Sequence, residues 1–126
     1  MLPQTAVETY LQAIAARDYA AIMALFAATA RVVHPIFGEQ SAADFFRTLL
    51  AKTRSDQPSH PIVFQACGRP DTFALYFEDD WTSQEGSHFH NSIVLIFEFE
   101  PGGKVQRLRV IFDTHPFRTQ DREGNP

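Results

Sequence analysis

The chain has 126 residues, a formal net charge of −4 and 44% hydrophobic residues, which predicts one globular domain with a single core. Lys and Arg do not cluster anywhere along this acidic sequence, so we do not expect nucleic acid as a partner. No apolar run approaches the roughly 18 residues that a membrane helix needs. We therefore expect no membrane association and a cytoplasmic location.

The first part of the chain has the apolar spacing of helices. A first amphipathic helix is predicted by the stripe Ala6, Val7, Tyr10, Leu11 and Ile14. Asp18 is a typical capping residue and predicts a second helix as far as Phe26. A short strand at 30–34 and a turn near Gly38 follow, and Ser41 caps a third helix. Its predicted buried face consists of Phe45, Phe46, Leu49 and Leu50.

The second part of the chain reads as strands joined by short turns. The predicted strands cover 61–68, 72–82, 87–100 and 104–113, and together they form an antiparallel meander. Helices followed by a curved antiparallel sheet make an α+β fold. We assign residues 1–118 to this single domain and residues 119–126 to a polar C-terminal tail.

The predicted strand at 93–97 is apolar on both of its faces. One face can pack on the helices, and the other needs a different cover. A second copy of the chain is the simplest cover, so we expect a homodimer through the sheet.

Metal and disulfide chemistry find little support in the sequence. Cys67 is the single cysteine, which excludes an internal disulfide, and its place in a strand-like run predicts a buried thiol. His88 and His90 leave the same strand face, as metal ligands can. Glu98 shares that face and favours a solvated surface instead. We therefore predict no metal and no cofactor.

Two polar side chains stand out among apolar surroundings. His34 ends a strand just before Pro35, and its ordinary pKa lies near neutral pH. Tyr10 lies on the buried stripe of the first helix. The twelve Phe residues suit either a cavity for a small apolar molecule or a plain core.

The order of elements and several local matches resemble the nuclear transport factor 2-like superfamily over roughly residues 4–115. The matching positions are Tyr10 with Leu25-Phe26, His34-Pro35, Asn91, and Lys104-Val105, Arg109 and Phe112-Asp113. Within that superfamily the chain resembles the ketosteroid isomerase and SnoaL-like polyketide cyclase branches. The resemblance implies a cone-shaped fold with three N-terminal helices on a strongly curved antiparallel sheet that encloses a pocket.

The ketosteroid isomerase resemblance implies roles for three positions. Tyr10 falls on the oxyanion-hole tyrosine of that family, and His34 takes the place of its general-base aspartate. Leu95 stands where the family has a protonated Asp, and leucine cannot donate a hydrogen bond.

The SnoaL-like resemblance implies roles for Asn91, which enters the long strand, and Asp113, which ends the last one. Strand alternation places Asn91 on an apolar face with Leu95, but it points Asp113 away from Phe112 unless a bulge intervenes. We take His34, Tyr10 and Asp113 as the candidate catalytic residues. The candidate ligand-binding residues are Ile14, Phe37, Trp81, Asn91, Leu95 and Phe112.

Two classes of function remain open. The first is a proton-transfer enzyme, of isomerase, cyclase or dehydratase type, that acts on a small hydrophobic carbonyl compound with His34 as the base. The second is a non-catalytic module of the same fold that binds a small molecule or forms a dimer. Epoxide hydrolysis ranks below both, because Arg109 and Asp113 have no second acid on their expected face.

Overall fold

Three helices precede or interrupt the strands in the computed structural model, which describes residues 3–118. They are α1 (Pro3–Ala15), α2 (Tyr19–Met23) and α3 (Ala42–Lys52). A single helical turn at 115–118 follows the last strand. None of the helices in the described part of the chain is long and apolar enough to cross a bilayer.

The N-terminal helices form where capping and apolar spacing predict them. Asp18 caps α2 by accepting a hydrogen bond from the Ala21 backbone N–H at 3.1 Å, and Ser41 caps α3 in the same way through the Asp44 N–H. Helix α2 ends at Met23 rather than at Phe26, because Phe26 already belongs to the first strand.

Six strands form one sheet in the order β2-β1-β6-β5-β4-β3. Their bounds are β1 (Phe26–His34), β2 (Gly38–Ser41), β3 (Thr53–Gln65), β4 (Thr72–Ser83), β5 (His88–Phe99) and β6 (Val105–Phe112). The expected meander is present, since β3 to β6 pair antiparallel in sequence order.

The sheet departs from the prediction in three places. The β1–β6 pair is parallel, which is possible because α3 and four strands separate the two in sequence, so the sheet is not wholly antiparallel. β2 was not predicted. β3 begins at Thr53 rather than at residue 61, and it contains Pro58 and Pro61. An edge strand tolerates proline, and a register shift between Ser59 and Ile62 accommodates the second one.

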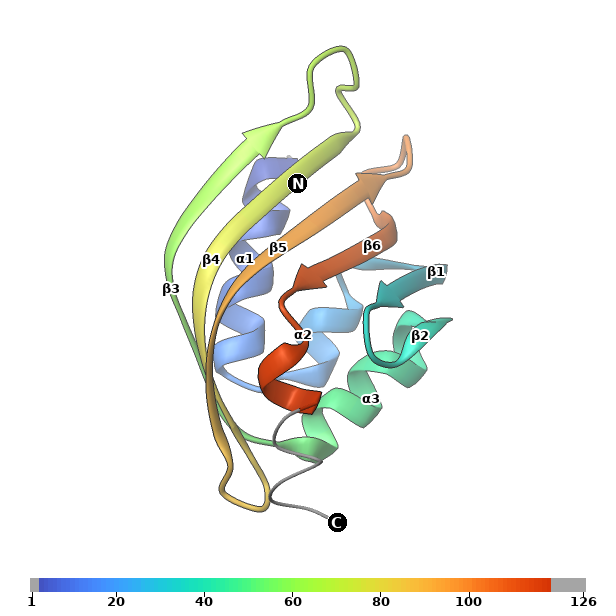
Figure 1. Cartoon of the computed structure of the whole chain (residues 1–126). Coiled ribbons are helices and arrows are strands. Elements are labelled where there is room, and N and C mark those ends of the chain that lie inside the picture. The colour runs from blue at the N-terminus through green and yellow to red at the C-terminus, as the bar shows by residue number, and fades with distance from the viewer. Residues whose placement is uncertain (1–2, 119–126) are drawn as a thin grey trace.

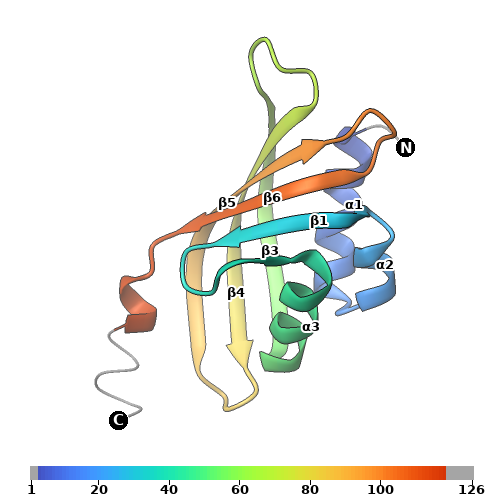
Figure 2. The same ribbon diagram turned by 90° about the vertical axis from the view of Figure 1, so that its right-hand side faces the viewer.

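The strands bend into an open cone around the helices. In Figure 1 the long strands β3, β4 and β5 curve around α1, and the helices lie on the concave side of the sheet. Figure 2 shows β1 and β6 running across β3 and β4 at a steep angle. This curvature gives the sheet an inner face that can enclose side chains and an outer face without any cover from the described helices.

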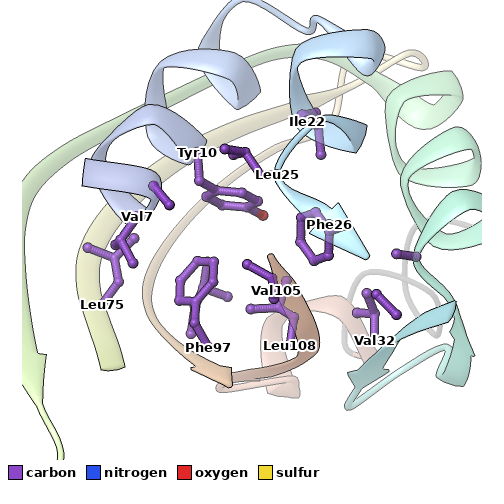
Figure 3. Close-up of a cluster of buried hydrophobic side chains, with 14 of the residues drawn as sticks. Val7, Tyr10, Ile22, Leu25, Phe26, Val32, Leu75, Phe97, Val105 and Leu108 are labelled. Carbon is purple, nitrogen blue, oxygen red and sulfur yellow. The ribbon is translucent and has the colours of Figure 1, made fainter. Parts of the chain in front are cut away.

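Large apolar side chains fill the space between α1 and the middle of the sheet. Figure 3 shows Val7 and Tyr10 of α1 meeting Leu75, Phe97 and Leu108 of three strands. The side chains of Leu75, Phe97 and Leu108 are almost completely buried. One predicted core residue is misplaced, since Cys67 is exposed in the turn after β3.

Candidate functional site

A cavity of about 490 Å³ lies between the inner face of the sheet and the helices α1 and α3. It is lined mainly by apolar side chains, and three exposed residues, Ile36, Lys52 and Glu85, mark its mouth. Eight of the nine candidate site residues from the sequence lie on its wall. They are Tyr10, Ile14, His34, Phe37, Trp81, Asn91, Leu95 and Phe112. Such a volume suits a small molecule.

The strand register arranges the sheet wall in rows. Asp56 lies opposite Trp81, and Trp81 lies opposite Phe89, across β3, β4 and β5. The next inner row places Asp79 opposite Asn91. Because side chains alternate across a strand, both rows point into the cone. The row with the polar residues Asp79 and Asn91 therefore lies directly beside the row with the aromatic residues Trp81 and Phe89.

Asp56 and Asp79 form a buried acidic pair on the cavity wall. Their exposed fractions are only 7% and 5%. Among the described residues, neither Oδ1 atom has a hydrogen-bond donor. The two carboxyl groups are within hydrogen-bonding reach of each other, and two ionised carboxylates so placed would repel. A proton held between them removes that conflict.

The surroundings of the acidic pair affect the pKa of its two carboxyl groups differently. Burial, followed by the hydrogen bond to Asp79 and the charge of Asp79, raises the pKa of Asp56 to about 9. Burial also raises the pKa of Asp79, but the hydrogen bond from Asp56 opposes the rise. Asp56 is therefore the member of the pair that holds a proton near neutral pH, and Asp79 is the more acidic of the two.

Tyr10 extends from α1 into the apolar core next to this pair. Its ring packs edge-on against Phe46 and Phe97, with centroids 6.0 and 5.4 Å away, and Figure 3 shows its oxygen directed toward Phe26. Burial and the nearby charges of Asp56 and Asp79 raise the pKa of the phenol far above its usual range. Tyr10 thus stays neutral and can act only as a hydrogen-bonding hydroxyl.

His34 is fixed by the turn that follows it. Its Nδ1 atom accepts hydrogen bonds from the backbone N–H groups of Ile36 and Phe37, at 3.1 and 3.2 Å. The ring stacks on Phe37 with centroids 4.6 Å apart. Since Nδ1 accepts, the neutral ring carries its proton on Nε2.

Burial also lowers the pKa of His34 to about 4. The expectation that this ring titrates near neutral pH therefore does not hold, because the surrounding side chains exclude the water that an imidazolium needs. At neutral pH His34 offers a hydrogen-bond donor at Nε2 to the cavity rather than a free base.

Asn91 and Leu95 share the inner face of β5. Asn91 is 8% exposed and lies opposite Asp79. Leu95 is 2% exposed between Leu75 and Val110 of the adjacent strands. The cavity therefore has the Asn91 amide beside the acidic pair and an apolar wall at Leu95, four residues further along β5.

Trp81 is held by a buried hydrogen-bond chain. Its indole Nε1–H donates to Thr53 Oγ1 at 2.8 Å, and the same hydroxyl donates to the Leu49 carbonyl at 2.6 Å. Thr53 is 1% exposed. This chain ties the aromatic wall to the C-terminal end of α3 and fixes its orientation.

A model of the SnoaL-like domain family matches residues 7–108. The chain belongs to the SnoaL-like domain family. Its fold is the nuclear transport factor 2-like cone, as the sequence resemblance implied. None of the curated proteins compared with the chain matches its sequence significantly.

Solved structures of this fold superpose over most of their length. A proposed polyketide cyclase from Pseudomonas putida KT2440 is 17% identical, with a TM-score of 0.78 over 95% of this chain and 98% of that one. TerC, co-crystallised with polyporic acid, is 20% identical with a TM-score of 0.76 over 93% and 95% of the two chains. At these identities the likeness establishes the fold.

A third neighbour is the epoxide hydrolase/cyclase-like enzyme SalBIII, described as acting in pyran ring formation in the polyether salinomycin. It is 20% identical, with a TM-score of 0.70 over 88% of this chain and 90% of that one. SnoaL-like and cyclase-like proteins thus share the cone that surrounds the cavity.

Asp113 is the one candidate residue of this SnoaL-like chain that lies away from the cavity wall. It is exposed just beyond β6, and its Oδ1 atom accepts a hydrogen bond from the His115 backbone N–H at 3.0 Å. Strand alternation pointed it away from the apolar face, and the pairing of β6 with β5 is regular from Arg107 to Phe112, so no bulge there turns it inward.

Asp56 and Asp79 were not among the candidate residues predicted from the sequence. Asp79 shares strand parity with Phe77 and Trp81, so alternation along β4 carried a signal for an inward carboxylate. Asp56 carried none, because Pro58 and Pro61 concealed the first half of β3.

The two strand histidines lie on the outer face. His90 bonds Asp80 at 2.9 Å through Nδ1 and Glu78 at 3.0 Å through Nε2, and His88 lies 3.2 Å from Asp80. The hydrogen bonds to Asp80 and Glu78 raise the pKa of His90. Within residues 3–118, no three His, Cys, Asp or Glu side chains are arranged to hold a metal ion.

Proposed function

We propose that this protein is a proton-transfer enzyme of cyclase or isomerase type that acts on a small, mainly apolar carbonyl compound. The observation that carries the proposal is the buried Asp56–Asp79 pair on the wall of an apolar cavity, where burial raises the pKa of both carboxyl groups. Perturbed acids in a cleft are typical of acid–base sites.

Asp79 is the proposed base. Its raised pKa makes it a stronger proton acceptor than an ordinary carboxylate. It would take a proton from the carbon next to a carbonyl group. The electron pair of that C–H bond would form a carbon–carbon double bond, and the π pair of the carbonyl group would move to its oxygen as the enolate forms. The proton then returns to a different carbon, or the enolate carbon attacks a second carbonyl to close a ring.

Neutral donors around the cavity would stabilise the enolate oxygen. The candidates are His34 through Nε2–H, the Tyr10 hydroxyl and the Asn91 amide, all of which line the cavity. Neutral donors suit this task because their protons stay in place at neutral pH. His34 therefore changes from the expected base to a proposed electrophilic partner.

The experiment that tests this proposal is hydrogen–deuterium exchange at the carbon next to the carbonyl, followed by NMR in D₂O with a panel of cyclic and aromatic ketones. It detects proton transfer without knowledge of the final product. Wild-type protein should accelerate exchange of at least one ketone, and Asp79→Asn should reduce that rate by about 100-fold or more. Asp80→Asn is the matched control, because Asp80 lies one residue away and is surface-exposed.

The alternative is a non-catalytic ligand-binding module. Leu95 favours it, since the position where the ketosteroid isomerase resemblance has an acid is apolar here. If at least one ketone binds but no member of the panel exchanges its protons, the protein is a ligand-binding module and not the proposed enzyme.

A further inference from the structure

The C-terminal end of the described chain returns to the cavity. β6 ends at Phe112, and residues 115–118 then form a single helical turn. Figure 2 shows this turn beside β5, away from α1 and α2. Phe117 of the turn lines the cavity. One part of the cavity wall therefore comes from a short terminal segment rather than from the sheet or the long helices.

The Phe117 ring packs on aromatic rings from three strands. It stacks on Phe89 with centroids 4.2 Å apart and planes at 18°. It also lies 6.2 Å from Trp81 and 5.4 Å from Phe112. A stack this close leaves no room for another ring between Phe117 and Phe89. A molecule can reach that part of the wall only after Phe117 has moved.

Local hydrogen bonds hold the turn in this position. Asp113 Oδ1 accepts from the His115 N–H at 3.0 Å, which is the usual way a short polar side chain starts a helical turn. The N–H groups of Phe117 and Arg118 donate to the Thr114 carbonyl at 3.1 and 3.2 Å. A single turn of this kind opens at lower cost than the strands around it.

We propose that Phe117 is a displaceable wall that controls access to the cavity, and that Asp113 is the positioning residue that keeps it closed. In the closed state Phe117 covers the Phe89 and Trp81 side of the cavity. Opening of the turn admits a small molecule to that side. This assignment gives Asp113 a role that needs no contact with a substrate. It goes beyond the proposed proton transfer and requires only that the cavity can admit a small molecule.

The chain carries its own reporter for this motion. Trp81 is the single tryptophan, and it lies on the cavity wall next to Phe117. Acrylamide quenching of its fluorescence measures how often a small molecule reaches the indole. The measurement needs no substrate, so failure of the gate and failure of the proposed enzyme activity are distinguishable.

Four variants separate a gate from a fixed wall. Phe117→Ala should raise the quenching rate constant by about twofold or more, because the indole is then accessible for a larger fraction of the time. Phe64→Ala is the matched control, since Phe64 is 53% exposed and does not line the cavity, and it should leave quenching unchanged. Asp113→Ala should raise quenching with Phe117 intact. Asp113→Asn keeps an oxygen that caps the turn and should behave as wild type.

Circular dichroism and cooperative unfolding establish that each variant is folded, and Phe117→Leu substitutes for Phe117→Ala if the latter is not. Equal quenching in the Phe117 variant and in Phe64→Ala overturns the proposal. Two further results would each refute one part of the proposal. If Asp113→Ala matches wild type while the Phe117 variant does not, Phe117 is a fixed wall. If Asp113→Asn matches Asp113→Ala, the cap is not what holds the turn.

Discussion

Asp56 and Asp79 are diagonal neighbours on the inner face of the β3–β4 pair, because Asp56 lies opposite Trp81 and Asp79 lies opposite Pro58. Both strands are long and continuous at this point, so the spacing of the two carboxyl groups is set by the sheet and not by a loop. A rigid frame of this kind keeps the two carboxyl groups together even though their ionised forms would repel each other.

The acidic pair should make folding stability fall as pH rises. The pKa of Asp56 is raised from 3.8 to about 9, so its neutral form is favoured in the folded chain, and its contribution to stability is present at low pH. That contribution is lost progressively above the unfolded pKa as the unfolded carboxyl ionises. Asp56→Asn removes this loss and should be more stable than wild type at about pH 8, by on the order of 1–3 kcal/mol.

Urea unfolding at about pH 5 and pH 8 measures this effect. Asp80→Asn is the control of opposite sign, because the hydrogen bond to His90 lowers the pKa of the exposed Asp80. Loss of that ionised carboxylate should weaken rather than strengthen the folded state at the higher pH. If the Asp56→Asn variant is less stable than wild type at pH 8, Asp56 is not a buried, protonated carboxyl group.

His34 should remain neutral well below neutral pH. Burial lowers its pKa to about 4 from the ordinary 6.5, so the ring contributes stability at neutral pH that is lost as pH falls below the unfolded pKa. A ¹H–¹⁵N NMR titration of the imidazoles should show the proton on Nε2 and no change in charge between about pH 7 and pH 5. A His34 midpoint near 6.5 would show an open, hydrated ring.

The outer face of the sheet should mediate dimer formation. A continuous row crosses four strands through Ile62, Tyr76, Val94 and Ile111, and Ile62 and Ile111 are 51% and 45% exposed. Apolar rows on an uncovered sheet face favour contact with a second copy. We predict a dimer at micromolar concentration in sedimentation velocity and a monomer for the double variant Ile62→Lys, Ile111→Lys.

The control for that experiment is Ile36→Lys, because Ile36 is also 45% exposed but lies at the cavity mouth. It should sediment as wild type does. If the wild type sediments as a monomer at tens of micromolar, the dimer prediction is wrong.

The hydroxyl of Thr53 should stabilise the fold through Trp81. Thr53→Val keeps the shape of the side chain but leaves the buried indole N–H without its acceptor, which costs about 1–3 kcal/mol. Thermal unfolding followed by Trp81 fluorescence measures the loss. Thr82→Val, one residue beyond Trp81 on the opposite face of β4, is the matched control. Equal unfolding temperatures for the two variants would mean that the Trp81 hydrogen bond adds nothing.

The fold was predictable from the sequence where periodicity and caps agreed. The caps at Asp18 and Ser41 and the meander from β4 to β6 form as expected. Only the second half of β3 was predicted, because prolines such as Pro58 and Pro61 normally end a strand. They are tolerated here because β3 lies at the edge of the sheet.

The candidate site was predictable only in part, for a physical reason. Alternation along β5 placed Asn91 and Leu95 on the inner face. The state of His34, by contrast, depends on backbone N–H groups from the turn after it and on burial, with Phe45 of α3 and Phe112 of β6 against its ring. A local pattern holds no information about burial of that kind, and so it could not indicate that the ring is a donor.

The proposed function depends on one proton that the cavity wall holds between two carboxyl groups. The most direct measurement is a pH titration of the aspartate side-chain ¹³C resonances by NMR, with Asp56 and Asp79 assigned through their single Asn variants. We predict that at pH 7 Asp56 is protonated, that its midpoint lies above neutral, and that the Asp79→Asn variant shifts it. Two carboxyl groups that are both fully ionised at pH 7 and that titrate independently near their ordinary pKa would contradict the account.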